Sequence, residues 1–186
     1  MKKLWSLCAC LFMISQSLYS LEIPRSAQVA ADSTGNIVAA WETVEITGDI
    51  VIEGAYYDAS ATTWSTPQQL SSMGLNSRTP RVATNGAGES VVIWESITGG
   101  ITRVYAACIG LQDVTPTWTA NTAISPVTQN VRGQSTTLTV TSGGVAVASW
   151  MGNVMTPSKI GFFVVTTAPG GIATNTWNSP TQVGGP

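Results

Sequence analysis

The sequence contains no histidine and few charged residues. Of its 186 residues, only 10% are Asp, Glu, Lys or Arg, against roughly 25% in an average soluble domain. Without histidine, the chain cannot build a Ser-His-Asp triad, a histidine general base or a histidine metal site. Cysteine is also scarce. Beyond the first twenty residues only Cys108 remains, in the apolar run VYAACIG, which predicts a buried thiol without a disulfide partner.

Several nucleotide and metal motifs are missing as well. The chain has no P-loop, no dinucleotide fingerprint and no EF-hand loop, and one cysteine cannot build a cysteine-rich zinc site. The net charge is −2 without a basic cluster, whereas nucleic-acid partners usually require a basic face. We therefore expect no cofactor, no metal and no nucleic-acid partner.

The first twenty residues have the pattern of a secretory signal peptide. Lys2 and Lys3 precede an apolar run over residues 4–14, and small polar residues follow up to Ser20. The apolar run is too short to span a bilayer, although a membrane anchor or a buried first strand are the alternatives. Removing residues 1–20 would leave six cationic residues against ten carboxylates, a net charge of −4, and no transmembrane segment. The expected location is secreted, periplasmic or cell-surface.

Tryptophan is what the sequence has in a regular arrangement. Six of the seven tryptophans form two columns that recur about every 55 residues. The first column is Trp41, Trp94 and Trp150, and the second is Trp64, Trp118 and Trp177. Self-similarity at a period near 50 residues indicates an array of small supersecondary units. We place these units at about 24–76, 77–132 and 133–186, within a repeat domain over residues 21–186.

Each unit predicts four short strands separated by turn residues. In unit one these are about 27–31, 37–42, 50–57 and 63–70, with turns such as Ser33-Thr34-Gly35-Asn36 between them. Gly35, Gly88 and Gly144 occupy equivalent positions, and no window has a sustained helical period. The prediction is an all-β fold of three four-stranded antiparallel repeats, forming a partial or oligomerising β-propeller. A β-sandwich is the alternative.

Three units do not complete a propeller, which typically closes with about 4–8 blades. The sequence leaves three explanations open: a truncated piece of a longer propeller, a ring assembled from two or more chains, or an open arrangement of blades.

Some of the repeated aromatic and charged positions are candidates for ligand binding. The first tryptophan column ends an alternating Val/Ala strand, which predicts packing between units. The second column lies beside a turn, where an exposed ring can stack on a sugar. Arginine and glutamate also recur in the first two units, whereas our alignment gives Gln134 and Met151 in the third. The candidate binding residues are Trp64, Trp118, Trp177, Arg25, Arg78, Glu42 and Glu95. Inter-unit packing and surface ion pairs are the structural alternatives.

The stretch from Ile23-Pro24-Arg25 through the Asp32–Gly35 turn to Trp41-Glu42 resembles the opening blade of sialidase-like propellers. The order here is Ile-Pro-Arg, and the family's Asp-box is not intact. The resemblance implies three arginines on a substrate carboxylate, a Tyr–Glu pair and an Asp acid/base. The corresponding residues to choose from are Arg25, Arg78, Arg81, Arg103, Arg132, Tyr56, Tyr57, Tyr105, Asp32, Asp49, Asp58 and Asp113. No spacing connects them, so no catalytic residue is assigned.

The leading functional expectation is a secreted or envelope-associated binding protein whose ligand is a glycan or a protein surface. A homo-oligomer that completes the propeller is an expected partner. The alternatives are a sialidase-like glycoside hydrolase and a structural or truncated fragment without its own activity.

Overall fold

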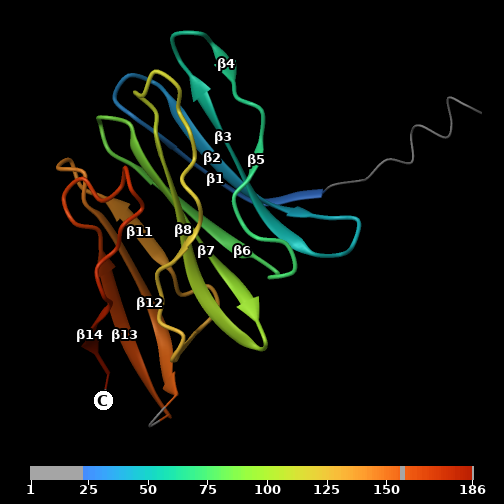
Figure 1. The fold of residues 1–186 in the computed structure, drawn as a ribbon, viewed down its shortest axis with the longest axis vertical. Coiled ribbons are helices and arrows are strands. Elements are labelled where there is room, and N and C mark those ends of the chain that lie inside the picture. The colour runs from blue at the N-terminus through green and yellow to red at the C-terminus, as the bar shows by residue number, and fades with distance from the viewer. Residues whose placement is uncertain (1–22, 156–157, 186) are drawn as a thin grey trace, which may run out of the picture.

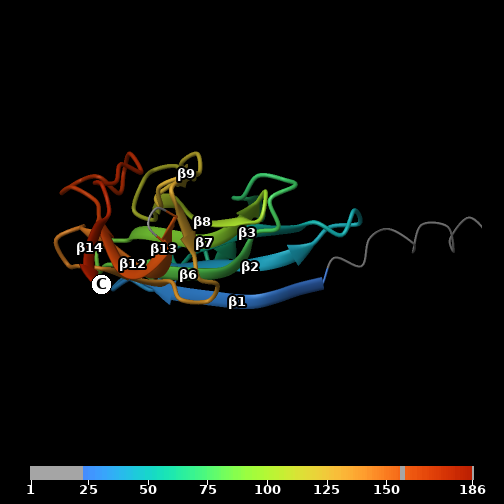
Figure 2. The ribbon, with the colours of Figure 1, turned by 90° about the horizontal axis from the view of Figure 1, so that it is seen from below.

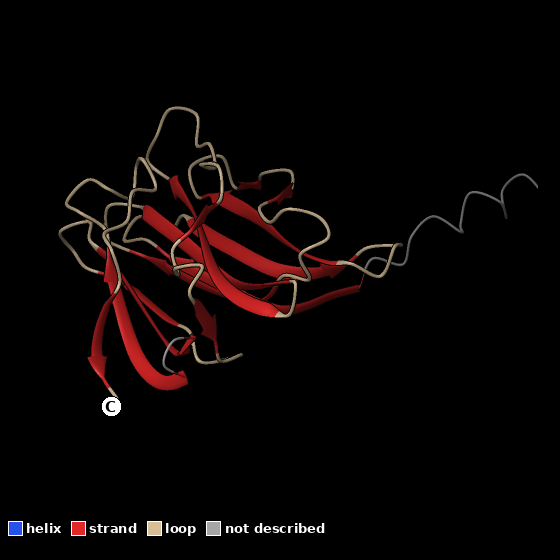
Figure 3. Ribbon diagram, turned by 60° about the horizontal axis from the view of Figure 1, so that its bottom comes forward, coloured by secondary structure: helices blue, strands red, loops and turns tan. Residues whose placement is uncertain are grey.

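The computed structural model of the chain describes residues 23–155 and 158–185. These residues form strands, turns and loops without a helix, in three antiparallel sheets that follow one another in chain order (Figures 1 and 3). The predicted all-β class is confirmed, while the predicted signal peptide lies outside the described residues. Within those residues, no helix is long and apolar enough to cross a membrane.

The first sheet has five strands, because its outermost position is filled by two short ones. β4 and β5 both pair with β3, so the strand expected over residues 63–70 is divided at residues 65–67. The strands of this sheet are β1 (Ile23–Ala31), β2 (Ile37–Val44), β3 (Ile50–Asp58), β4 (Thr63–Trp64) and β5 (Gln68–Gln69).

The second sheet has four strands in sequence order. Its long central hairpin, formed by two ten-residue strands, is almost wholly buried at its centre. The strands are β6 (Arg78–Thr84), β7 (Glu89–Thr98), β8 (Ile101–Gly110) and β9 (Thr122–Ala123).

The third sheet again has five strands, and here the first position is divided. β10 and β11 both pair with β12, so this sheet begins before the expected unit boundary at residues 132 and 133. Its strands are β10 (Gln129–Val131), β11 (Thr137–Val140), β12 (Ala146–Met155), β13 (Ser158–Thr166) and β14 (Thr181–Gly184).

The three equivalent glycines make the first hairpin turn of each sheet possible. Gly35, Gly88 and Gly144 have φ values of 91°, 81° and 71°. Residues with a Cβ rarely adopt this left-handed region, so glycine is required where the chain reverses between the first two strands.

The sheets pack face to face, and the second sheet uses opposite faces for its two neighbours. We call the face turned toward the next sheet in the chain the forward face, and the face turned toward the previous sheet the rear face. Because strand side chains alternate between faces, Val91 and Ile93 lie on the forward face of the second sheet while Val92 and Trp94 lie on its rear face.

Two apolar clusters fill the spaces between the sheets. The cluster between the first and second sheets contains Val38, Ala40, Ile52, Leu70, Val92, Trp94, Ala107, Ile109 and Leu111. The cluster between the second and third sheets includes Val91, Ile93, Val104, Ala106, Cys108, Ala146, Ala148, Trp150, Phe163 and Val165. Trp94 and Trp150 are almost fully buried on rear faces, as expected for the first tryptophan column. Its third member, Trp41, lies at the equivalent position of the first sheet.

The first strands of neighbouring sheets lie side by side along one edge of this arrangement. β1 contacts β6, and β6 contacts β11. Figure 2 shows β1 and β6 together along the lower edge, with the loop around β9 on the opposite side. Equivalent residues of the three sheets are therefore held next to one another, which positions the surfaces described below.

Candidate functional site

The predicted arginines are exposed at the start of the first strand of their sheets. Arg25 lies across the strand pair from Glu42, and Arg78 lies across from Glu95. The structure thus places each predicted arginine beside its predicted glutamate, as cross-strand neighbours.

The third sheet carries an arginine at this position too, two residues earlier than the sequence alignment placed the match. Val131 pairs with Gly152, and the Arg132 N–H donates to the Met151 carbonyl at 2.8 Å. Arg132, and not Gln134, is therefore the cross-strand neighbour of Met151. We call the three exposed residues Arg25, Arg78 and Arg132 the arginine row.

The predicted glutamates join one sheet to the next. Glu42 and Glu95 are 6% and 4% exposed. Glu42 accepts a hydrogen bond from the Thr79 backbone N–H at 2.8 Å, and Glu95 accepts one from the Gln134 N–H at 2.9 Å. The other Glu95 oxygen accepts from the Thr136 hydroxyl at 3.2 Å. We call this arrangement the inter-sheet carboxylate contact. A direct role of these glutamates in ligand binding stays a prediction.

The second tryptophan column has two members that pack between sheets and one that does not. Trp118 packs against the first cluster and Trp177 against the second. Trp118 lies so close to Gly54 that a Cβ there would be 3.0 Å from the indole. Trp64 is 52% exposed and lies beside Tyr57, with ring centroids 5.5 Å apart. The role of this column in ligand binding stays a prediction.

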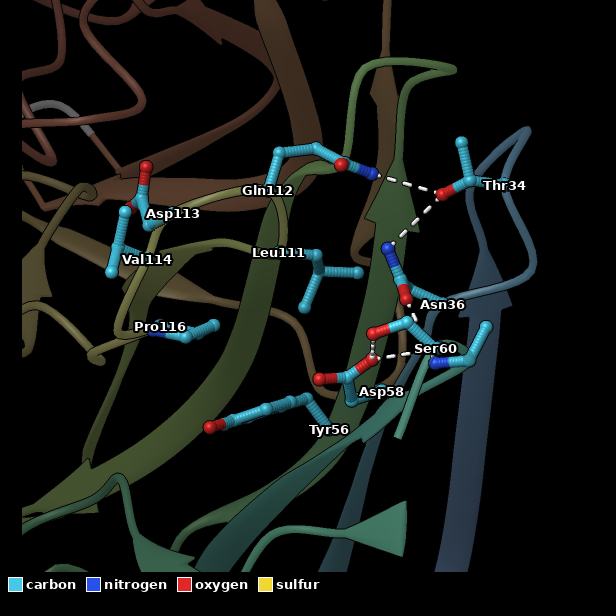
Figure 4. A pocket seen from close by; sticks show the side chains of 11 residues that line it. Thr34, Asn36, Tyr56, Asp58, Ser60, Leu111, Gln112, Asp113, Val114 and Pro116 are labelled. Atoms are coloured by element: carbon cyan, nitrogen blue, oxygen red, sulfur yellow. Dashed lines mark hydrogen bonds between the residues drawn. The ribbon is translucent and has the colours of Figure 1, made fainter. Parts of the chain in front are cut away.

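A polar cavity of about 320 Å³ lies between the first and second sheets (Figure 4). One wall comes from the β1–β2 turn and the end of β3, and the other from the loop that follows β8. We call it the polar cleft. Its lining residues are Thr34, Asn36, Tyr56, Asp58, Ala59, Ser60, Leu111, Gln112, Asp113, Val114 and Pro116.

The Asp32 carboxylate holds the β1–β2 wall of the polar cleft in place. One oxygen accepts from the Thr34 N–H and hydroxyl, both at 2.8 Å, and from the Asn36 N–H at 3.0 Å. The other accepts from the Asn36 amide at 2.9 Å and from the Gln112 amide at 2.8 Å. Burial raises the pKa of Asp32, but the hydrogen bonds from Thr34, Asn36 and Gln112 outweigh it, so the pKa lies below its ordinary value. Because Gln112 lies on the loop that follows β8, this carboxylate also connects the two walls of the cleft.

Asp58 presents an ionised carboxylate to the polar cleft. One oxygen accepts from the Ser60 hydroxyl at 2.7 Å, the Ser60 N–H at 2.8 Å and the Ala61 N–H at 3.1 Å. These hydrogen bonds, first of all the one from the Ser60 hydroxyl, lower the pKa of Asp58. In Figure 4 the other oxygen points away from Ser60 into the cavity, and the Tyr56 ring extends beside it. Asp113 lies on the facing loop.

The lining combines a rigid acidic rim with amide and aromatic groups. Asp58 supplies a carboxylate acceptor, Asn36 and Gln112 supply amide groups, and no lysine or arginine lines the cavity. The Asp113 carboxylate points away from Asp58 and lies against Gly110, beside the cavity between the second and third sheets. Such a lining suits a ligand that donates several hydrogen bonds and presents an apolar patch to the tyrosine ring. The negative charge of Asp58 opposes an anionic ligand at this place.

This combination is specific to the first pair of sheets. The register of the central hairpins makes Glu89, Cys108 and Gly110 the second-sheet equivalents of Asn36, Tyr56 and Asp58. The matching space between the second and third sheets is a smaller cavity of about 160 Å³ lined in part by Glu89, Gly110 and Ile172. The repeat therefore builds the cleft twice, but only the first copy has a tyrosine, and the carboxylates of the second copy come from Glu89 and Asp113.

Redox and metal chemistry find little support in the part of the chain that the structure describes. No group of three acidic, cysteine or histidine side chains is placed there to hold a metal ion. Cys108 is buried as predicted, and burial raises the pKa of its thiol to about 12. A thiol with such a pKa is a poor nucleophile near neutral pH.

Comparison with known proteins gives similarity at the level of fold alone. No protein-family model matches the chain, and no curated protein matches it in sequence. A solved structure named "Hadza microbial sialidase Hz136" superposes with a TM-score of 0.57 and 13% sequence identity. The match covers 86% of this chain and 37% of the sialidase, so the chain spans little more than a third of that protein. The chain thus has a fold similar to part of a sialidase.

Proposed function

We propose that this protein binds a neutral or cationic glycan in the polar cleft between its first and second sheets. The observation that carries the proposal is the lining itself: an aromatic ring, the Asp58 carboxylate and two amide side chains line one cavity without a cation. Sugar hydroxyls donate hydrogen bonds to carboxylates, and the apolar face of a pyranose stacks on an aromatic ring. The solved structure that resembles part of the chain is named a sialidase, which supports a carbohydrate-related role for this architecture.

The cleft is suited to binding rather than to chemistry. Asp58 is stabilised in its ionised form by three hydrogen bonds, so it is a poor proton donor. Asp32 is likewise bonded on both oxygens and supports the cleft wall instead of facing a ligand.

The proposal includes the finer architecture and the location expected from the sequence. The three sheets are proposed to be consecutive blades of a β-propeller. The packing supports this, because both contacts between sheets join the forward face of one sheet to the rear face of the next, as in a radial array of blades. The pattern of residues 1–20 supports export, so the protein acts outside the cytoplasm, in the periplasm or at the cell surface.

A protein surface rich in lysine is the other ligand that an acidic cleft accepts.

Binding to an immobilised panel of neutral, amino-substituted and sialylated glycans tests the proposal. Wild-type protein should retain neutral or amino-substituted glycans and not sialylated ones. Tyr56→Phe and Asp58→Asn should each weaken retention about tenfold, the value of one good polar contact. Asp49→Asn is the matched control, because Asp49 lies in the β2–β3 turn away from the cleft lining. Retention that survives both cleft variants, in protein with unchanged circular dichroism, would refute the cleft as the site.

A sialidase-like glycoside hydrolase is the second candidate, and the arginine row favours it. The resemblance implies three arginines, and the structure places Arg25, Arg78 and Arg132 at one register position in three adjacent sheets. Turnover of a fluorogenic sialoside that is lost in Arg132→Ala would support this function. Absence of turnover by folded protein would remove it.

A further inference from the structure

The forward-to-rear packing leaves two sheet faces without a neighbour in the described chain. The forward face of the first sheet meets the rear face of the second, and the forward face of the second meets the rear face of the third. The forward face of the third sheet and the rear face of the first remain at the two ends. They are the two kinds of face that pack together twice within the chain.

The forward face of the third sheet exposes large apolar side chains. Met151 on β12 pairs with Phe162 on β13, and Ile160 lies on the same face of β13. Their exposed fractions are 42%, 40% and 43%. The second-sheet counterparts of Phe162 and Met151 are Val104 and Glu95, and both are buried at the contact with the third sheet. A contiguous apolar patch of this kind on a sheet face indicates a contact surface.

The rear face of the first sheet has the complementary features. Trp64, at the equivalent position to the inter-sheet Trp118, is 52% exposed, and Val29 on β1 is 67% exposed. Ser26 adopts φ of 50°, the same left-handed conformation as Thr79 (54°) and Gln134 (64°). In the second and third sheets that conformation presents the backbone N–H to the carboxylate of the preceding sheet. The first sheet is thus shaped to receive a forward face.

We propose that a second copy of this chain packs here, with the third sheet of each copy against the first sheet of the other. Two such contacts related by a two-fold axis close a ring of six sheets, which leaves no sheet face unpaired. The proposal rests on the blade arrangement stated under Proposed function, but not on its ligand.

Met151 shows how the contact between copies differs from the two contacts within a chain. It occupies the place of Glu42 and Glu95, so the inter-sheet carboxylate contact is missing where the third sheet would face Ser26 of the second copy. The missing hydrogen bond predicts a dimer that dissociates reversibly, in contrast to the permanent packing of sheets within the chain. Met151→Glu supplies a carboxylate at this place and should tighten the dimer.

Sedimentation equilibrium and light scattering of the purified protein test this proposal. Wild-type protein should form a discrete dimer with a measurable dissociation constant. Phe162→Glu should raise that constant at least about tenfold by burying an unpaired charge, and Met151→Glu should lower it about tenfold by adding a charge-assisted hydrogen bond at each contact. Ile46→Glu is the control, because Ile46 is an exposed apolar residue in the β2–β3 turn and should leave the constant unchanged.

Three results would overturn the proposal: a wild-type monomer at all concentrations, an open-ended series of larger oligomers, or a dimer that Met151→Glu weakens as much as Phe162→Glu does. Circular dichroism and the urea midpoint of each variant separate loss of association from loss of folding. The polar cleft lies within one copy, so glycan retention by a monomeric Phe162→Glu variant shows whether the ligand proposal stands independently.

Discussion

Removing the Glu95 carboxylate should weaken the packing of the second sheet on the third. The side chain is 4% exposed, and its two oxygens accept from the Gln134 N–H and the Thr136 hydroxyl. A hydrogen bond to a charged group contributes about 1.5–3 kcal/mol, and burial of the carboxylate offsets part of the sum of two. Glu95→Ala should therefore lower the free energy of unfolding by about 2–4 kcal/mol.

Urea unfolding followed by tryptophan fluorescence measures this loss, because Trp94 and Trp150 are buried in the two inter-sheet clusters. Glu95→Gln should cost about 1 kcal/mol or less, since its carbonyl still accepts from Gln134 and its amide can donate to Thr136. Glu45→Ala is the control, because only backbone bonds of Glu45 hold the β2–β3 turn. A loss below about 0.5 kcal/mol in Glu95→Ala, or an equal loss in Glu45→Ala, would refute the reasoning.

Three further predictions concern the cleft wall, the packing of the first pair of sheets and the buried thiol. Asp32→Ala should lower the free energy of unfolding by about 1–3 kcal/mol at neutral pH. Because folding lowers the pKa of Asp32, the stabilisation by its carboxylate is present above about pH 4 and is lost as the pH falls below that. The stability of the variant should therefore depend less on pH in acid than that of the wild type. Gly54→Ala should destabilise by about 1–3 kcal/mol through overpacking, since its Cβ would lie 2.8 Å from Leu70 and 3.0 Å from the Trp118 ring. The cost should shrink in a background that carries Leu70→Val and Trp118→Phe, and equal costs in both backgrounds would contradict this reasoning. Cys108 should resist iodoacetamide at pH 8 in the folded protein and react after unfolding in urea, whereas rapid labelling of folded protein would contradict its burial.

The sequence predicts the three-sheet architecture well because its markers are local. A turn glycine such as Gly35 is required by the geometry of its own hairpin, and Trp94 fills the same rear-face position of β7 that Trp150 fills in β12, so both markers recur at fixed intervals. The arginine of the third sheet escaped this alignment for a local reason as well. One additional residue separates the left-handed Gln134 from the turn glycine Gly144, compared with the first two sheets, and Arg132 lies two positions before Gln134. A fixed spacing cannot detect such an insertion.

The candidate site was harder to predict because no single repeat contains it. In the sequence, Tyr56, Asp58 and Asp113 stand out only as single candidate residues, because no regular spacing connects them. Asp113 is more than fifty residues from the other two. The packing of the second sheet on the first brings them to one cavity, with Gln112 reaching across to Asp32. One signal was available in the sequence: positions 56 and 58 are polar in the first unit, while their equivalents are Cys108 and Gly110 in the second.

The most direct test of the account is to map where a neutral oligosaccharide binds, by following backbone amide shifts of isotope-labelled protein during titration. The account predicts that saturable shifts concentrate at the polar cleft, including Asn36, Ser60, Gln112 and Asp113. It also predicts that Asp58→Asn moves the midpoint of the titration to an about tenfold higher oligosaccharide concentration while Asp49→Asn leaves it unchanged. Saturable shifts confined to the arginine row, with the cleft amides unchanged, would contradict it.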